Sequence, residues 1–136
     1  MTSGTVRFDV PAEVAFDYLV DPRNRPQWQS SLRRVQDVDG EVRVGQTWTD
    51  VTKPGLRPAM TTTELERPTR WTESGTWRFV RADLTLTFEP VDAGSCDVTY
   101  SFRFFGLGPV GAVVSAVSRP AVGSDLRRAA RLVARL

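Results

Sequence analysis

The chain has 136 residues, a net charge of +2, seventeen arginines against a single lysine, and no histidine. This length fits one domain over residues 1–136, large enough to fold without a disulfide or a metal. The lack of histidine excludes Ser-His-Asp and Cys-His catalysis and removes the most common metal ligand, so we expect neither a metal nor a cofactor. The small net charge does not favour a nucleic-acid partner.

The sequence shows no targeting or membrane-spanning segment. Its first residues contain no apolar core of the kind found in signal peptides. The longest apolar stretch, residues 110–122, is interrupted by serines, an arginine and a proline, and it is too short to cross a bilayer. We therefore expect a soluble, cytoplasmic protein without an integral membrane segment.

The first third of the chain predicts a strand followed by two short helices. Residues 5–10 alternate apolar and polar side chains, as in a half-buried strand. Pro11 suits the first turn of a helix, and that helix should end at Asp21, because a residue before proline avoids the helical conformation. Asp21 can cap a new turn that begins at Pro22. The segment therefore predicts a helix, a sharp bend, and a second short helix that carries Trp28.

The middle of the chain predicts a β-sheet, and its end predicts a long helix. Segments rich in threonine, valine and aromatic residues lie at 46–52, 59–66, 70–80, 82–90 and 96–104. Several connections are short enough for hairpins, which favours antiparallel pairing. From Pro109 onward apolar residues recur at helical spacing, and we interpret the arginines between them as a solvated helix face.

The order of several motifs points to a known family. The motifs are "FDVPAEVAFDYLVDP" with Trp28 after it, "VGQTW", "LERPTRW" and "GLGPVG" before the last helix. This arrangement resembles the SRPBCC superfamily of START-like, or polyketide-cyclase-like, helix-grip proteins. The resemblance implies an α+β helix-grip fold. In it a curved antiparallel sheet of about seven strands wraps around a long C-terminal helix, two short helices follow the first strand, and a ligand cavity lies between sheet and helix.

The register of residues 59–66 decides which of their side chains face this cavity. The turn that follows Glu66 pairs Leu65 with Trp71, which turns Thr61 and Thr63 inward. A slip of one residue would replace them by a different set, Met60, Thr62 and Glu64.

Alternation along the strands predicts an apolar, largely aromatic inner face with a few polar groups, a composition that suits a small-molecule site. The expected ligand-binding residues are Trp28, Trp48, Asp50, Thr61, Thr63, Trp71, Trp77, Leu84, Leu86, Phe102, Val113 and Val117.

Glu73 and Tyr100 are the candidate catalytic residues. Glu73 lies on the inner side of its strand, where it could orient a ligand hydroxyl or act as a general acid or base. The alternative, which we favour, is that Glu73 pairs with one of the many arginines. Tyr100 is either a ligand contact or a core residue. Trp28 in turn either closes the cavity or anchors the core.

Three functions fit this sequence. We favour the binding of a hydrophobic small molecule such as a lipid, a polyketide or an isoprenoid-like compound. The resemblance also permits a polyketide cyclase, aromatase or dehydratase that needs no metal and no covalent nucleophile. Such enzymes often carry an arginine or histidine inside the cavity, and the sequence places no arginine clearly there. The third function is a protein-interaction domain, like the co-chaperones and toxin-partner proteins that share the fold. A homodimer is possible.

Overall fold

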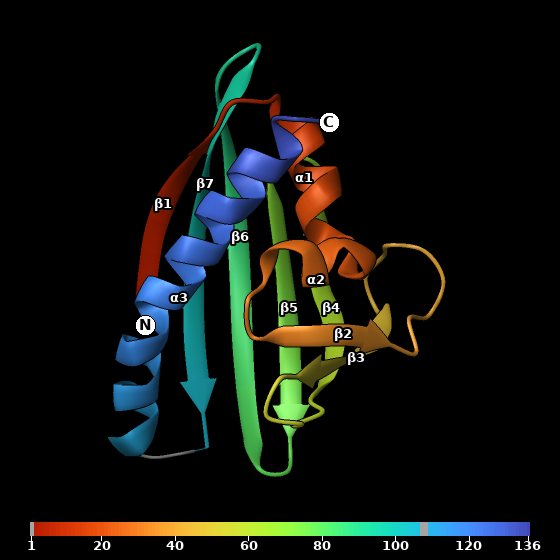
Figure 1. The fold of residues 1–136 in the computed structure, drawn as a ribbon, viewed down its shortest axis with the longest axis vertical. Helices are drawn as coiled ribbons and strands as arrows, with labels where there is room; N and C mark the ends of the chain where they lie inside the picture. Colours follow the sequence, from red (N-terminus) through yellow and green to blue (C-terminus); the bar gives the residue numbers. More distant parts are fainter. Residues whose placement is uncertain (1, 107–108) are drawn as a thin grey trace.

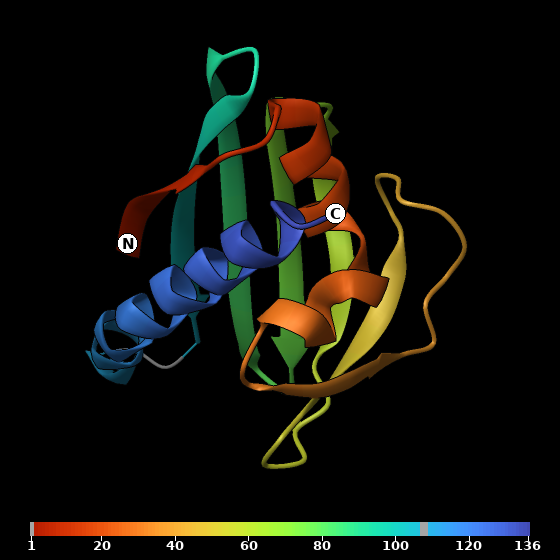
Figure 2. The same cartoon turned by 45° about the horizontal axis from the view of Figure 1, so that its top comes forward.

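The molecule is a curved antiparallel sheet with all its helices on one face. The computed structural model describes residues 2–106 and 109–136, with side chains for 3–106 and 121–136. In this part of the chain seven strands are ordered β1-β7-β6-β5-β4-β3-β2. The long helix α3 crosses the face of the sheet, and α1 and α2 cover the same face beside it (Figures 1 and 2). This arrangement is the predicted helix-grip fold.

The strands are β1 (Thr2–Phe8), β2 (Leu32–Gln36), β3 (Thr47–Thr52), β4 (Ala59–Glu66), β5 (Arg70–Trp77), β6 (Val80–Asp92) and β7 (Ser95–Phe105). The helices are α1 (Ala12–Val20), the 3₁₀ turn η1 (Pro22–Asn24), α2 (Arg25–Trp28) and α3 (Pro109–Val133). None of the described helices is long and apolar enough to span a membrane.

Pro22 and Pro26 turn the chain sharply after α1, as the sequence predicts for Pro22. Asp21 has extended backbone, and its carboxylate accepts a hydrogen bond from the Arg23 amide at 3.0 Å, which caps η1. Asn24 then donates to the carbonyl oxygen of Tyr18 at 3.1 Å, so that the turn is tied back to α1. Because of this bend, α2 lies over the sheet rather than continuing along the axis of α1.

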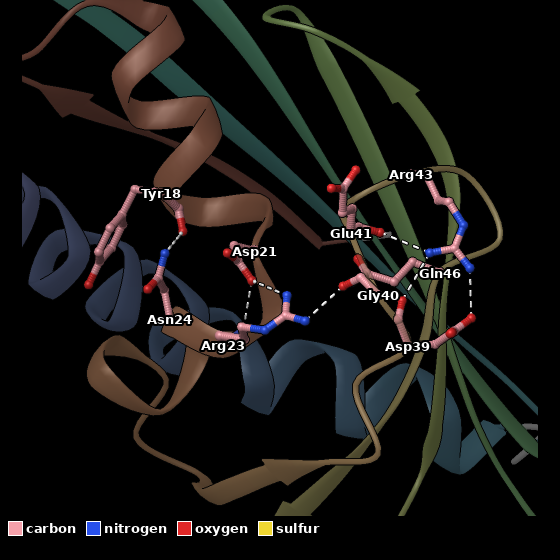
Figure 3. A network of polar contacts seen from close by, with 9 residues as sticks. All are labelled: Tyr18, Asp21, Arg23, Asn24, Asp39, Gly40, Glu41, Arg43 and Gln46. Carbon is pink, nitrogen blue, oxygen red and sulfur yellow. Dashed lines mark hydrogen bonds and ion pairs between the residues drawn. The ribbon is translucent and has the colours of Figure 1, made fainter.

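A polar network joins this corner to the connection between β2 and β3 (Figure 3). Arg23 donates to the carbonyl oxygen of Gly40 at 2.7 Å, and the Gln46 amide donates to the same oxygen at 3.1 Å. Arg43 pairs with Asp39 at 2.7 Å and steadies the connection itself. The network therefore ties η1, just before α2, to the connection between β2 and β3.

The core lies between the sheet and the helices. It includes Phe8, Phe16, Leu19 and Leu86, each at most 1 % exposed. The predicted apolar stripe of α3 is confirmed where its side chains are described, with Leu126, Ala129 and Val133 buried. The arginines of this part of α3, at positions 127, 128 and 131, are exposed, as expected for a solvated helix face, and so is Arg135 just after the helix.

The predicted register of β4 was wrong for half of the strand. Leu65 does lie opposite Trp71, but a β-bulge at Thr63 shifts the pairing by one residue beyond it. Thr62 therefore faces Glu73, where we expected Thr63, and Met60 faces Gly75, where we expected Thr61. Since side chains alternate along a strand, the one-residue shift exchanges the two faces. Met60 and Thr62 are buried, whereas Thr61 and Thr63 point away from the interior.

Candidate functional site

Two adjoining cavities lie on the face of the sheet that carries the helices. The first, which we call the helix-side cavity, has a volume of about 250 Å³ and is lined by α2, the sheet and α3, including Trp28, Leu86 and Leu126. The second, the hairpin-side cavity, has a volume of about 290 Å³ and extends toward the β5–β6 turn, past Gly75 and Trp77. The two share five lining residues, which are Gln29, Ser31, Glu73, Leu84 and Phe102. They therefore adjoin at Glu73.

A buried ion pair stands at this junction. Arg25 of α2 donates from Nη1 to Glu73 Oε2 at 2.7 Å and from Nη2 to Oε1 at 2.8 Å. Both residues are nearly inaccessible, Arg25 at 2 % and Glu73 at 4 % exposure. Such a bidentate pair is the strongest arrangement of these two groups. It confirms the interpretation that Glu73 pairs with an arginine.

The sequence around the corner explains how Arg25 comes to lie inside. The bend at Pro22 and the short helix α2 direct its side chain toward β5 rather than toward solvent. Its guanidinium lies 5.0 Å from the ring centre of Trp28 and 5.7 Å from that of Trp71, and both rings attract a cation. Nε donates to the Gln29 side chain at 2.8 Å. All three nitrogens of the guanidinium are therefore engaged by protein acceptors.

Two more carboxylates act on Arg25. Burial disfavours its charge, but Glu73, Asp50 and Asp125 outweigh burial and raise the pKa of Arg25. Asp50 is buried on β3 and accepts a hydrogen bond from Trp48 Nε1 at 3.0 Å. Burial raises the pKa of Asp50 to about 6, with Glu73 adding to the increase and Arg25 opposing it. Asp50 therefore changes protonation near neutral pH.

The structure brings together most of the predicted ligand-binding residues. Leu84 and Phe102 line both cavities, Trp28 and Leu86 line the helix-side cavity, and Asp50 and Trp77 line the hairpin-side cavity. Trp48 and Trp71 are buried beside the site and contact its charged groups. Val113 and Val117 lie outside the residues whose side chains the structure describes.

Tyr100 lies apart from the cavities. A Cβ atom added to Gly4 of β1 would stand 2.5 Å from its hydroxyl oxygen, and one added to Gly123 of α3 would stand 3.2 Å from it. Tyr100 thus packs between β1 and α3, where neither cavity reaches it. Tyr100 is therefore a core residue, one of the two alternatives that the sequence left open, and not a cavity contact. The predicted inner face was wrong at Thr61 and Thr63, which point outward.

Sequence reasoning missed the polar residues that act on the ion pair, Arg25, Gln29 and Asp125, and three further polar residues of the lining, Ser30, Ser31 and Thr52. The sequence placed no arginine clearly inside the cavity, because the side of α2 that points inward depends on the Pro22 bend; the structure places Arg25 there. Asp125 could have been identified from the sequence more easily than Arg25. It is an acidic residue within the apolar stripe of α3, next to Leu126, and it lines the helix-side cavity at 8 % exposure.

The described residues offer no other obvious reactive group. No set of three or more acidic or cysteine side chains among them is arranged to hold a metal ion. Cys96 is buried, and burial raises the pKa of its thiol to about 11, so the thiol stays protonated at neutral pH. The chemistry of the site is therefore that of buried carboxylates, one guanidinium and apolar walls.

Comparison with known proteins agrees with this geometry. The model of the family described as polyketide cyclase / dehydrase and lipid transport matches residues 2–136. The chain belongs to this family. No curated protein sequence matches the chain.

Solved structures similar to this member of the polyketide cyclase / dehydrase and lipid transport family share its fold at low sequence identity. A START superfamily protein from Mycobacterium smegmatis is 15% identical, with a TM-score of 0.73 over 98% of this chain and 94% of that chain. Norcoclaurine synthase from Thalictrum flavum is 11% identical, with a TM-score of 0.74 over 98% and 85%. The di-domain ARO/CYC BexL of the BE-7585A biosynthetic pathway is 18% identical, with a TM-score of 0.73 over 96% of this chain and 45% of that chain.

Proposed function

We propose that the protein binds a hydrophobic small molecule, such as a lipid, polyketide or isoprenoid-like compound, in the two adjoining cavities. The observation that carries the proposal is the paired space of about 250 and 290 Å³ under the helices. Left empty, 250 Å³ of apolar cavity would cost about 6 kcal/mol, which is comparable to the whole stability of a domain. A guest or water must therefore fill it, and the apolar walls favour an organic guest.

The polar groups indicate how a guest would be oriented. The indole N–H of Trp28 is buried and has no hydrogen-bond acceptor among the described residues. A buried donor without a partner costs about 1–3 kcal/mol, so a guest with a carbonyl or hydroxyl oxygen gains by supplying one. The carboxylates of Asp50 and Asp125 in turn suit a guest that donates a hydroxyl proton.

Binding can be tested with the neutral apolar dye Nile red and with native mass spectrometry of protein purified from cells. Leu84→Trp places a large ring at the shared wall of both cavities and should weaken Nile red binding at least tenfold. Val91→Trp is the matched control, because Val91 is 47 % exposed on the same strand. Equal binding by the two variants, with no apolar compound copurifying, would show that the cavities are not a binding site.

A second candidate function is acid–base catalysis on an apolar carbonyl compound. The observation that favours it is Asp50, a buried carboxyl at the cavity wall with a pKa of about 6, near the buried cation Arg25. A base there can remove a proton from the carbon next to a carbonyl and return one from solvent. Deuterium uptake by acetophenone, followed by NMR, tests this. The wild type should accelerate exchange and Asp50→Asn should not; equal rates would leave binding as the function.

A further inference from the structure

The turn between β5 and β6 exposes two large aromatic side chains. Phe79 in the turn is 76 % exposed, and Trp77 at the end of β5 is 36 % exposed, although the other tryptophans of the sheet, Trp48 and Trp71, are buried. Trp77 pairs with Val80, so Arg78 and Phe79 alone form the turn. Most of the hydrophobic surface of this phenylalanine is therefore in water, which is costly for a side chain of its size.

The backbone of this turn is also strained. Arg78 has a φ of +56°, a conformation that hairpin turns usually assign to glycine or asparagine. A bulky residue held there costs on the order of 1–3 kcal/mol. A glycine-containing turn would remove both the strain and the exposed ring, so folding stability does not account for this sequence.

Arginines lie against two aromatic rings at this end of the sheet, the exposed Trp77 and the half-buried Phe105. The guanidinium of Arg78 lies 4.7 Å from the ring centre of Trp77, and those of Arg81 and Arg103 lie 4.2 and 5.2 Å from the ring centre of Phe105. We call this group the hairpin-tip surface: residues 77–79, Arg81, Arg103 and Phe105.

The β3–β4 connection extends this charge. It lies at the same end of the molecule, opposite the β6–β7 turn (Figures 1 and 2), and contributes Lys53, Arg57 and the exposed Leu56. The adjacent acid is Asp83, 3.4 Å from Arg81. It offsets one of the positive charges and leaves the others in excess at this end.

The hairpin-tip surface adjoins the hairpin-side cavity. Trp77 belongs to both, and Val80 and Phe104, which flank the tip, also line that cavity. The apolar cavity thus lies beside the exposed rings of Trp77 and Phe79 and the guanidinium of Arg78, while Arg81 and Arg103 stand on the other side of the sheet at the same end. Aromatic and basic side chains in this combination are typical of segments that lie at the boundary of a negatively charged membrane.

We propose that the hairpin-tip surface docks on an anionic membrane and brings the hairpin-side cavity to the lipid headgroups. Phe79 enters the boundary between headgroups and acyl chains, Trp77 lies at headgroup level, and the arginines contact lipid phosphates. Docking goes beyond the proposed function and does not depend on it. The added consequence, that an apolar guest passes between membrane and cavity without crossing water, does rest on the proposed function.

Co-sedimentation with vesicles tests docking. The wild type should bind vesicles of mixed phosphatidylcholine and phosphatidylglycerol, and bind much less to phosphatidylcholine alone. Phe79→Ser should weaken binding about tenfold, because it removes the inserted ring. Arg78→Gln should weaken it about fivefold at low salt and less at high salt. Val91→Ser, an exposed apolar residue on the opposite hairpin, is the matched control and should bind as the wild type does.

Tryptophan quenching gives an independent measurement of the docked face. Trp28, Trp48 and Trp71 are at most 3 % exposed, so a quencher in the membrane reaches chiefly Trp77. Brominated phosphatidylcholine in the mixed vesicles should reduce the emission of the wild type, and Trp77→Phe should abolish this reduction. Quenching that persists in Trp77→Phe would place another face on the membrane and overturn the proposal.

Other results would also overturn it. Wild-type protein that stays in the supernatant with both kinds of vesicle does not dock. If Phe79→Ser instead converts a dimer to a monomer in sedimentation velocity, the surface contacts a second copy. If single-stranded DNA or RNA binds it more tightly than vesicles do, the arginines serve nucleic acid. In each case Nile red binding by the wild type, and its loss in Leu84→Trp, would still report separately on the proposed function.

Discussion

Arg25 and Glu73 form the most consequential residue pair in the molecule. Removing two charges from water costs several kcal/mol per ion, and only good geometry compensates for this. Here the geometry is bidentate, two tryptophan rings face the cation, and Gln29 accepts from the remaining nitrogen. The pair joins α2 to β5, so it also holds the helix over the cavities.

Breaking this pair should be far more damaging than breaking an exposed one. Arg25→Met leaves the Glu73 carboxylate buried without a partner and should lower the free energy of unfolding by about 3–5 kcal/mol. Arg25→Met combined with Glu73→Met should recover most of that loss, since neither charge of the pair is then left buried without its partner. Urea denaturation of the three proteins measures both effects.

The control is the ion pair of Arg67 with Asp17, whose side chains are 56 % and 57 % exposed. Arg67→Met should leave the urea midpoint essentially unchanged, because exposed pairs contribute little. If Arg25→Met were as harmless as Arg67→Met, water would have to reach Glu73, contrary to the burial described above.

Asp50 should give the protein a recognisable pH dependence. Its pKa of about 6 in the folded state exceeds the ordinary value of 3.8, so the folded form binds this proton more tightly than the unfolded chain does. Between about pH 4 and pH 6 the contribution of Asp50 to stability therefore falls as pH rises, by up to about 3 kcal/mol.

The variant Asp50→Asn tests this pH dependence, because asparagine still accepts a hydrogen bond from Trp48 but does not titrate. The stability of Asp50→Asn relative to the wild type should rise across this range and level off above it. A constant difference in urea titrations from pH 4 to pH 8 would contradict the raised pKa.

At the scale of the elements, β4 shows what alternation can and cannot predict. The sequence "TTT" at 61–63 carries no signal that distinguishes an inward from an outward threonine. The turn fixes Leu65 against Trp71, but a single extra residue at Thr63 reverses every side chain beyond it. The antiparallel hairpins, the helix positions and the corner at Asp21 followed from local rules, because proline, capping and periodicity act over a few residues.

The site was less predictable for a related reason. Residues of long, regular strands, such as Leu84, Leu86 and Phe102, could be assigned to the interior from alternation alone. Arg25 lies in a four-residue helix that is too short to have a periodicity of its own, so its direction depends on the angle of the Pro22 bend. Its partner Glu73 is 48 residues away, and only the packing of α2 on the sheet brings the two together.

The junction after β7 has a steric requirement that can be tested. Gly106 has a φ of +97°, and a Cβ atom there would stand 2.3 Å from the carbonyl oxygen of Phe79. Gly45 has a similar φ of +89° but nothing within 4 Å. Gly45→Ala should therefore cost the strain alone, about 1–3 kcal/mol, and Gly106→Ala should cost at least 1 kcal/mol more. Thermal or urea unfolding of both variants measures the difference; equal losses would mean that the hairpin tip yields freely to the added methyl group.

Over the whole molecule, the charge in the cavities determines which guests are acceptable. Among the described residues that line them, Arg25 is the only cation, and Asp50, Glu73 and Asp125 are acids. A guest carboxylate would enter an environment with excess negative charge, where the guanidinium is already occupied. Burying an unpaired anion costs several kcal/mol.

We therefore expect dodecanol to displace Nile red at concentrations at least tenfold lower than dodecanoate at pH 7.5. The two compounds have the same chain length, so apolar burial is matched and the comparison isolates the charge. A preference for dodecanoate would mean that the anion displaces Glu73 from Arg25, and Arg25→Met with Glu73→Met should then abolish that preference.

The division of the space by Glu73, Leu84 and Phe102 sets a condition on molecular shape. A long compound that fills both cavities must place its middle beside the Glu73 carboxylate and the Arg25 guanidinium. Its two ends then contact apolar side chains. Chains oxygenated near the middle satisfy this requirement better than soaps or detergents, whose polarity is terminal. Selectivity in this protein would then depend on where along its length a compound carries its oxygen.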